Sequence, residues 1–201
     1  IANKPLALSK VEGEAEESTK TDGWQPQAKL GDGESSNPDD LRDKINAFDW
    51  KAEFPQVFTR QNPGFDAIIG NPPWLMAGYY ITDSLDYFRN KFASARGKFD
   101  TYYLFIEKGL SLISNVGLFG MIVPNKFFHT KAASTLRSLL SQPKLIHSIL
   151  DFGDEQIFSG ATNYSSILFL QKCEVSDTVS YAKAKEGLEI IQEFRVPSAS
   201  L

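Results

Sequence analysis

The chain has 201 residues, of which 42% are hydrophobic and 12% aromatic, and its formal net charge is −4. This length and composition exclude an intrinsically disordered protein and favour a single globular core. The acidic total also excludes a uniformly basic nucleic-acid-binding surface.

The sequence excludes several classes of site by what it lacks. The single cysteine, Cys173, rules out an internal disulfide and a cysteine-based zinc site, and two scattered histidines, His129 and His147, do not indicate a metal. No run reaches the roughly 18 apolar residues that cross a bilayer, and the acidic, polar N-terminus is not a signal peptide. We therefore expect a cytoplasmic protein without a metal or membrane contact. Because the chain begins at Ile1 and ends at Leu201, we also expect it to be a piece of a longer polypeptide.

The first 47 residues differ in composition from the rest. Residues 11–44 are rich in Glu, Asp, Gly, Ser and Lys and poor in aliphatic residues, so burial would not repay the entropy of ordering them. We predict that residues 1–47 form an acidic linker or loosely ordered arm. The aromatic stretch at residues 48–58 is apolar enough to pack on the core of a domain that spans residues 48–201.

A stiff loop follows the first predicted strand. Residues 65–70 are a short apolar run closed by glycine and proline, which predicts a buried parallel strand. Pro72 and Pro73 fix their own φ angles, remove two backbone donors and push Asn71 out of the helical region. Asn71 offers an amide oxygen, the prolines offer backbone carbonyls and Trp74 offers a flat face, a set that suits an aromatic amine. The alternative is a proline turn that only closes the strand.

Helices and strands alternate in the rest of the chain. We predict helices over residues 83–95, with Asp83 as the N-cap, from residue 100 to a stop at Asn115 and Gly117, and over residues 130–141. We predict strands over residues 117–123, 145–152, 165–171 and 179–182. The pattern indicates an α/β fold with a mainly parallel sheet covered on both faces. Only a short polar stretch separates strands 145–152 and 165–171, so that pair should be antiparallel.

Positive charge is concentrated around the proline loop. Residues 51–150 carry 11 basic and 6 acidic residues, a net charge of +5, whereas the segments on either side are acidic. The basic residues just past the loop are Arg89, Lys91, Arg96 and Lys98. They are placed to neutralise phosphates, although a solvated basic helix face has the same composition.

The sequence from residue 64 to residue 74 resembles the catalytic loop of the amino-methyltransferases. Its wider setting is similar to the adenine-N6 DNA methyltransferases of bacterial restriction-modification systems. Residues 98–109 resemble the helix that follows the loop in those enzymes, residues 117–125 their next strand, and residues 156–162 with 167–170 a later block. The order of blocks matches the subgroup whose target-recognition domain follows the catalytic domain. The resemblance spans roughly residues 48–172.

The resemblance implies a partial S-adenosylmethionine-dependent methyltransferase (Rossmann-like) fold, in which residues 48–201 are the C-terminal half of the catalytic domain. The implied catalytic residues are Asn71, Pro72, Pro73 and Trp74. Trp74, where the family more often has Tyr or Phe, would grip the target base together with Phe158, and Phe105 with Asn71 would contact the cofactor. The implied DNA contacts are Arg89, Lys91, Arg96, Lys98 and Lys126.

One hallmark of the resemblance is missing from this sequence. The glycine-rich loop that holds the methionine part of S-adenosylmethionine, and the acidic residue that binds its ribose, should lie upstream of the catalytic loop. Gly31-Asp32-Gly33 has no hydrophobic strand before it and does not fit. We therefore expect the isolated chain to be inactive, and to need the remainder of the parent polypeptide for its cofactor-binding half and target-recognition domain.

The implied reaction moves a methyl group from S-adenosylmethionine to N6 of adenine in double-stranded DNA. Hydrogen bonds to the Asn71 side-chain oxygen and the Pro72 carbonyl would localise the nitrogen lone pair. Stacking on Trp74 and Phe158 would offset the cost of base flipping, of order a few kcal/mol. No strong general base is required, and we expect Asp66 to be structural. The alternatives are methylation of cytosine N4, RNA or protein glutamine, and a non-catalytic nucleic-acid-binding or scaffold fragment.

Overall fold

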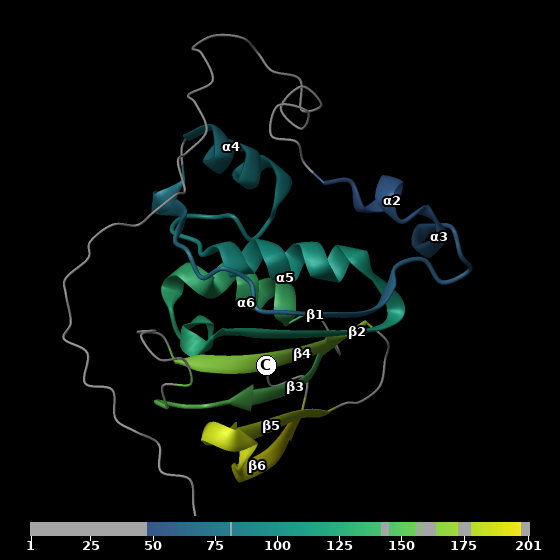
Figure 1. The fold of residues 1–201 in the computed structure, drawn as a ribbon. Coiled ribbons are helices and arrows are strands. Elements are labelled where there is room, and N and C mark those ends of the chain that lie inside the picture. The colour runs from purple at the N-terminus through teal and green to yellow at the C-terminus, as the bar shows by residue number, and fades with distance from the viewer. Residues whose placement is uncertain are drawn as a thin grey trace, which may run out of the picture. The chain divides into compact units, whose positions relative to one another are not determined.

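A mixed sheet of six strands carries the described part of the chain, in the order β1-β2-β4-β3-β5-β6 (Figure 1). The computed structural model describes residues 48–80, 82–141, 145–155, 157, 164–172 and 178–197. All of them belong to one compact unit, Asp32–Leu201. The predicted acidic segment 1–47, the Gly31-Asp32-Gly33 sequence and Phe158 lie outside the described residues.

The strands follow the predicted α/β pattern with one addition. Their bounds are β1 Phe65–Gly70, β2 Ile113–Pro124, β3 Ile146–Asp151, β4 Ser165–Gln171, β5 Thr178–Ala184 and β6 Ile190–Pro197. β1 is parallel to β2 and β3 to β5, whereas β4 is antiparallel to β2 and β3, and β6 to β5. Four strands therefore share one direction, and the α/β class and the antiparallel β3–β4 pair are confirmed. β6, which the sequence did not indicate, is a second antiparallel strand.

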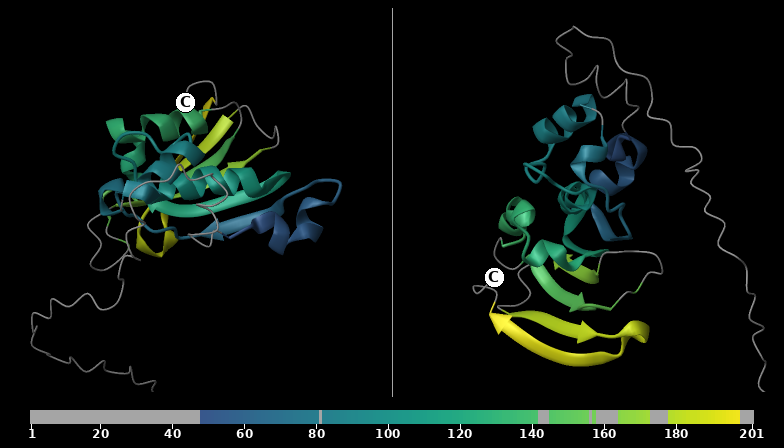
Figure 2. Two further views of the ribbon diagram at one scale, coloured as in Figure 1. Left: turned by 90° about the horizontal axis from the view of Figure 1, so that it is seen from above. Right: turned by 90° about the vertical axis from the view of Figure 1, so that its left-hand side faces the viewer.

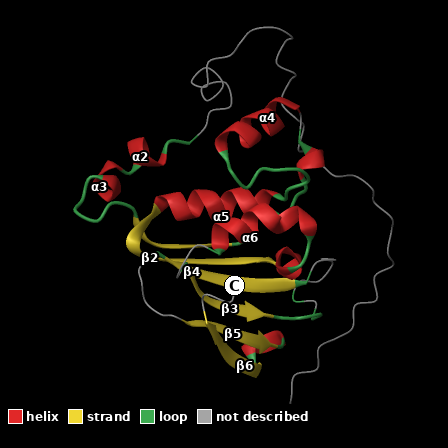
Figure 3. Cartoon of the chain, turned by 180° about the vertical axis from the view of Figure 1, so that it is seen from behind, coloured by secondary structure: helices red, strands yellow, loops and turns green. Residues whose placement is uncertain are grey.

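The helices lie mainly in the first two thirds of the described chain. The α-helices are α2 Trp50–Glu53, α3 Pro55–Phe58, α4 Thr82–Lys91, α5 Thr101–Leu112 and α6 Ser134–Leu140, and the short 3-10 helices are η1 Ala77–Tyr79, η2 Asn125–Phe128, η3 Lys131–Ala133 and η4 Glu186–Leu188. Figure 3 shows the sheet from behind, with α5 and α6 in front of it near β1 and β2. The views in Figure 2 also place both helices on this side of the sheet.

Several predicted helix boundaries are wrong. α4 begins at Thr82 and ends at Lys91, so Asp83 lies inside its first turn and the helix stops short of residue 95. The chain leaves the helix there because the backbone amides of Ala93 and Ser94 donate to the Glu107 carboxylate, each at 2.8 Å. The next helix ends at Leu112 rather than near Gly117, because pairing with β1 already begins at Ile113.

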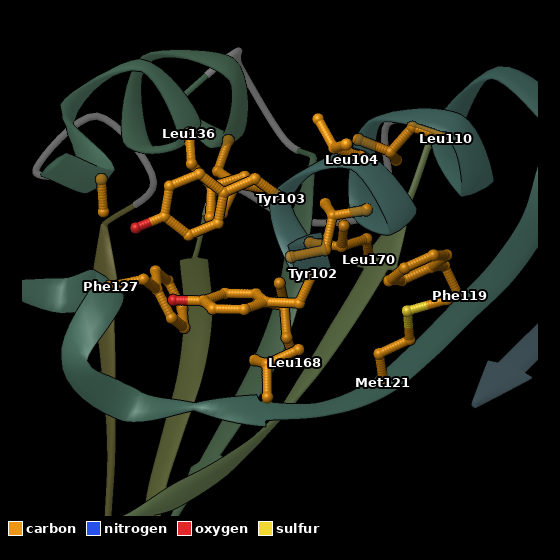
Figure 4. Close-up of a cluster of buried hydrophobic side chains, with 14 of the residues drawn as sticks. Tyr102, Tyr103, Leu104, Leu110, Phe119, Met121, Phe127, Leu136, Leu168 and Leu170 are labelled. Carbon is orange, nitrogen blue, oxygen red and sulfur yellow. The ribbon is translucent and has the colours of Figure 1, made fainter. Parts of the chain in front are cut away.

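The core lies between α5, α6 and the face of the sheet that they cover. Tyr102, Tyr103 and Ile106 of α5 and Leu136 of α6 have no exposed surface, and Phe119 of β2 is 1% exposed. Figure 4 shows the two tyrosines packed against side chains from both helices and strands. This burial follows from the helical spacing of the apolar residues of α5.

On the other face of the sheet, the prediction of buried strands is wrong. Residues 65–70 form a parallel strand as expected, but Ile69 is 85% exposed instead of buried. Leu118 on β2 and Phe169 on β4 are also exposed, at 52% and 39%. Within the described ranges, the expected cover on both faces is therefore found on one face only.

The aromatic stretch that precedes β1 forms short helices, and its rings pack on Phe65 of β1 rather than on the main core. The rings of Trp50, Phe54 and Phe58 lie 5.5–5.8 Å from the ring of Phe65. Aromatic pairs at this separation add to the free energy gained from burial alone. The cluster therefore fixes the N-terminal end of β1.

Gly64 joins this cluster to β1 in a conformation that suits only glycine. Its φ angle is +116°, and a Cβ atom there would lie 2.5 Å from the backbone nitrogen of Ser114. Other residues rarely adopt such angles, and backbone atoms of β2 leave no space for a side chain. The start of β1 is thus held tightly against the junction between α5 and β2.

Asp151 joins β3, β5 and the segment after β2 at one end of the sheet. One of its carboxylate oxygens accepts hydrogen bonds from Asn125 Nδ2 and from the Gly153 amide, both at 3.0 Å. Its other oxygen accepts one from the Tyr181 hydroxyl at 2.5 Å. Burial, together with this hydrogen bond, raises the pKa of Tyr181 above its usual range.

Gly109 on α5 gives a first test of the core. A Cβ atom at this position would lie 2.3 Å from the buried ring of Phe119. Although alanine is the better helix former, we expect Gly109→Ala to lower the free energy of unfolding by about 1–3 kcal/mol because of overpacking. Urea unfolding measures this change. Ser111→Ala, at an exposed position on the same helix, should stay within about 0.5 kcal/mol of wild type, and a stabilised Gly109→Ala variant would contradict the packing.

Tyr181 predicts a dependence of stability on alkaline pH. Its pKa is raised on folding, so its contribution is complete below pH about 10 and is lost as the pH rises above that value. We expect Tyr181→Phe to cost about 1–3 kcal/mol at pH 7, because an oxygen of Asp151 loses its donor. We also expect the variant to lose stability less steeply than wild type above pH 10. Urea unfolding at pH 7 and above pH 10 checks this, with Tyr79→Phe at an exposed position as the control. The same loss of stability with pH in Tyr181→Phe and in wild type would contradict it.

Candidate functional site

The proline loop directly follows β1, at the end of the sheet where the parallel strands β1 and β2 finish. Asn71 and Pro73 are exposed, Pro72 is buried and Trp74 is half-buried. Trp74 packs partly against the core cluster, which fixes one side of its indole. The loop is thus anchored by alternate residues and leaves Asn71 at the surface.

The residue after Trp74 is bound to the start of α5. The Thr101 amide and the Thr101 hydroxyl both donate to the Leu75 carbonyl, each at 2.8 Å, and the Leu75 amide donates to the Thr101 hydroxyl at 3.1 Å. Met76 forms an antiparallel bridge with Asp100, and the Ala77 amide donates to the Phe99 carbonyl at 2.8 Å. These bonds hold both ends of the loop, since its other end continues β1.

Asn71 is the side chain that this scaffold leaves available. None of the other described residues forms a hydrogen bond with its amide group, and its side chain is exposed. A neutral amide can accept through its oxygen and donate through its nitrogen. The loop therefore presents one hydrogen-bonding group on a stiff support, three residues before Trp74 in the sequence.

Phe105 is not part of the core. It is 43% exposed, whereas its neighbours Leu104 and Ile106 on α5 are buried. Its side chain therefore does not fill the buried stripe of α5. An exposed aromatic ring on the helix that anchors the loop offers a flat face for stacking.

The predicted basic residues lie on α4 and the segment that follows it. Arg89, Lys91, Arg96 and Lys98 are all exposed. α4 packs toward the loop region, because the ring of Phe88 lies 5.4 Å from that of Tyr80 and 6.4 Å from that of Phe99. The Arg96 guanidinium donates to the Arg89 carbonyl at 2.9 Å, which ties the two residues together.

Lys126 lies in a different environment from these four residues. Its amino group is 3.0 Å from a carboxylate oxygen of Asp100, which is 5% exposed. The ion pair connects the segment after β2 to the start of α5, next to the bridge between Met76 and Asp100. A phosphate would have to compete with a buried carboxylate for this lysine.

Asp66 has a structural role, as expected. The Arg60 guanidinium donates to both of its carboxylate oxygens, at 2.6 and 2.9 Å. This hydrogen bonding lowers the pKa of Asp66 and raises that of Arg60. Asp66 is thus engaged at the start of β1, at the opposite end of the strand from Asn71.

Sequence reasoning missed the residues that support the loop. Thr101 and Glu107 lie in the helix predicted from residue 100, but the first binds Leu75 and the second binds the segment after α4. The only local signal was the polar character of Thr101 at the start of an apolar helix. Their partners lie 13 to 26 residues away in the sequence, and no local pattern identifies such pairs.

The described residues offer neither a metal site nor a membrane-spanning helix. They contain no group of three or more His, Cys, Asp or Glu side chains that could hold a metal ion. None of the helices in the described ranges is both long and apolar enough to cross a membrane.

Known proteins similar to this chain include members of restriction-modification systems. The type II restriction enzyme and methyltransferase RM.Eco57I of Escherichia coli is 35% identical over 132 residues, which is 64% of this chain and 13% of that protein. The type II methyltransferase M.BanIII of Aneurinibacillus aneurinilyticus is 28% identical over 67% of this chain and 22% of its own length. Among solved structures, the type IIL restriction-modification enzyme MmeI in complex with DNA overlaps 65% of this chain and 18% of its own, with a TM-score of 0.49 and 17% identity.

The class of protein follows from the match to a family. The family described as Eco57I restriction-modification methylase matches residues 2–158, which include the proline loop, α5 and β2. The chain belongs to this family of restriction-modification methylases. It spans between an eighth and a quarter of the length of the two curated relatives.

Thr101 gives a test of how the loop is held. Thr101→Val keeps the shape of the side chain but removes the hydroxyl, so the Leu75 amide loses its acceptor. We expect a loss of about 1–3 kcal/mol in the free energy of unfolding and faster hydrogen exchange at the Leu75 amide. Urea unfolding and exchange measured by mass spectrometry check both effects.

The controls for this test separate the hydroxyl from the residue. Thr101→Ser should keep both properties close to wild type. Thr59→Val removes an exposed hydroxyl that donates to Pro55 at 2.9 Å, and should change the free energy of unfolding by less than about 0.5 kcal/mol. Unchanged exchange at Leu75 in Thr101→Val would show that the hydroxyl does not hold the loop.

Proposed function

We propose that this chain carries the target-base part of a DNA methyltransferase that moves a methyl group from S-adenosylmethionine to N6 of adenine. The observation that carries the proposal is the loop of residues 71–74, which is held at the end of β1 with the Asn71 amide exposed and the Trp74 indole fixed by the core. Membership of the restriction-modification methylase family gives this loop its context.

The chemistry of Asn71 suits an amino group that is a poor nucleophile. The adenine nitrogen lone pair is delocalised into the ring. Its two N–H groups would donate hydrogen bonds to the Asn71 side-chain oxygen and the Pro72 carbonyl. These hydrogen bonds favour a lone pair that is localised on the nitrogen. A stiff loop is required for this, because acceptors that must first be ordered would lose part of their effect.

The target base must leave the DNA stack to reach such a loop. Trp74 offers one stacking face, and Phe158 is proposed as the second. Stacking offsets part of the flipping cost, of order a few kcal/mol. The segment between the loop and α5 carries four exposed basic residues, Arg89, Lys91, Arg96 and Lys98. We propose that they contact phosphates.

The described residues include candidates for one side of a cofactor site. S-adenosylmethionine supplies an electrophilic methyl group when it is bound. Phe105, with an exposed ring on α5, is suited to stack on a purine, and Asn71 is exposed at the end of β1. We propose that these two residues contribute one side of the cofactor site, and that the glycine-rich side is contributed by another part of the intact enzyme.

Substitution of Asn71 tests the assignment in the intact enzyme. We expect Asn71→Ala to reduce methyl transfer by about a hundredfold or more, because a preorganised acceptor is lost. Binding of S-adenosylmethionine, measured by calorimetry, should weaken far less than methyl transfer, because Asn71 is only one of the groups proposed to contact the cofactor. Asn115→Ala, an exposed position at the opposite end of the paired strands, should transfer methyl at the wild-type rate.

The identity of the product decides between the candidate substrates. Nucleoside analysis by mass spectrometry should find N6-methyladenine in DNA after incubation with wild type. N4-methylcytosine, methylated RNA or methylated protein glutamine would replace the adenine assignment with one of its alternatives. Transfer at the wild-type rate by Asn71→Ala would refute the role of Asn71.

A further inference from the structure

Asn125 is the first residue after β2, and it binds both ends of the connection between β3 and β4. Its backbone amide donates to the Tyr164 carbonyl at 2.9 Å, directly before β4 begins. Its side-chain nitrogen donates to the Gly153 carbonyl at 3.0 Å, two residues after β3 ends. One residue from a different part of the sequence therefore holds the two ends of this connection.

Asp151 fixes the orientation of the Asn125 side chain. The Asn125 nitrogen donates to Asp151 Oδ1 at 3.0 Å, and the Gly153 amide donates to the same oxygen at 3.0 Å. A primary amide has two N–H groups, so Asp151 and Gly153 together use both of them. Asp151 is 7% exposed, and a buried carboxylate is a strong hydrogen-bond acceptor. Rotation of the Asn125 amide would break both of its bonds.

The bond between Asn125 and Asp151 crosses a whole strand. β4 lies between β2 and β3, so these two strands are about 10 Å apart. On one side of β4, Pro124 pairs with Ser165. On the other side, Asp151 pairs with Ser166. The ends of β2 and β3 are therefore level with the start of β4, and Asn125 joins them past the first residue of that strand.

This contact lies at the end of the sheet that carries the proline loop. β1 is parallel to β2, and β2 and β3 are both antiparallel to β4, so β1, β2 and β3 run in one direction. Asn71 and Asn125 directly follow β1 and β2, and Asp151 is the last residue of β3. In open α/β sheets, ligands bind at the carboxyl ends of the strands.

The residue after Asn125 connects this contact to the support of the proline loop. The Lys126 amino group is 3.0 Å from a carboxylate oxygen of Asp100. Asp100 directly precedes Thr101, whose hydroxyl and amide hold the Leu75 carbonyl. Residues 125 and 126 therefore join two segments of the site, the proline loop and the connection between β3 and β4.

The connection between β3 and β4 contains Phe158, the proposed second stacking residue for the target base. Ends that are held together remove conformations from the residues between them. A side chain on a restrained connection loses less entropy when it binds a ligand. A bond that holds these ends thus favours capture of the base without touching it.

We infer that Asn125 is a positioning residue for the target base, which acts by holding the connection between β3 and β4 relative to the proline loop. The inference rests on the proposed function, since the role of Phe158 belongs to that proposal. The alternative is that Asn125 only stabilises the fold.

Substitutions on the two sides of Asp151 separate these roles. Asn125→Ala removes the donor to Asp151 Oδ1 and to Gly153. Tyr181→Phe removes the donor to Asp151 Oδ2 and leaves the bonds to Gly153 and Tyr164 in place. Both substitutions leave a buried acceptor without a donor, so both should lower the free energy of unfolding. Only Asn125→Ala should release an end of the connection.

Methyl transfer is measured in the intact enzyme in a single turnover, with saturating DNA and S-adenosylmethionine. We expect Asn125→Ala to lower the rate at least tenfold. Its affinity for S-adenosylmethionine, measured by calorimetry, should stay within twofold of wild type. Tyr181→Phe should transfer methyl within twofold of the wild-type rate. Asn125→Gln, which keeps both N–H groups but moves them by one methylene, should give a smaller loss and replaces Asn125→Ala if that variant fails to fold.

A mismatched duplex tests whether the loss lies in capture of the base. The site is mapped from the product of wild type, and the target base is then placed opposite a mismatched base, which lowers the cost of flipping. We expect the deficit of Asn125→Ala relative to wild type to shrink at least threefold on this duplex. A deficit of the same size on both duplexes would overturn the role in base capture.

The other outcomes are equally decisive. Wild-type transfer by Asn125→Ala and Asn125→Gln would overturn the inference, and so would equal losses in Asn125→Ala and Tyr181→Phe, which would leave Asn125 a stabilising role only. The proposed function fails separately. A product other than N6-methyladenine, or full activity of Asn71→Ala, would contradict that proposal, and the expected rates for the Asn125 variants would still support a positioning role.

Discussion

The hydrogen bonds between Leu75 and Thr101 are the contact on which the rest of the site depends. They join an irregular loop to the first residue of the most buried helix in the described chain, so the position of the loop becomes a property of the core. The Asp100–Lys126 ion pair then joins the same helix start to the segment after β2. Three segments from different parts of the sequence therefore meet at one end of the parallel strands. A change in the packing of α5 would reach Asn71 through this route.

Much of the architecture could be predicted because apolar runs are local signals. The strands at residues 65–70 and 165–171 were predicted with the bounds that the structure shows. The end of α5 could not be predicted from the sequence. The change from helix to strand at Ile113 results from pairing with a strand more than 40 residues earlier. β6 escaped prediction because its residues are mostly exposed and mix charged with apolar side chains, so neither period stands out. Its order comes from pairing with β5.

The candidate site divides in the same way. The loop was predictable from two prolines and an asparagine, whose backbone effects act within a few residues. The hydroxyl of Thr101 and the carboxylate of Glu107 were not, since their role depends on partners brought close by the fold. The environment of Lys126 was also hidden, because an ion pair with Asp100 cannot be read from the spacing of charges. Stabilising contacts at a site are commonly of this non-local kind.

Gly64 shows that the register of the loop is set partly at the far end of β1. Its close approach to Ser114 fixes the register of β1 against β2. The six residues of β1, at about 3.3 Å each, place Asn71 roughly 20 Å from this contact. A slip of one residue would turn every side chain of β1 to the opposite face, exchanging Ile68 with Ile69. The loop would then leave the sheet one residue out of step with Thr101. A residue outside the loop thereby sets the position of Asn71 and Trp74.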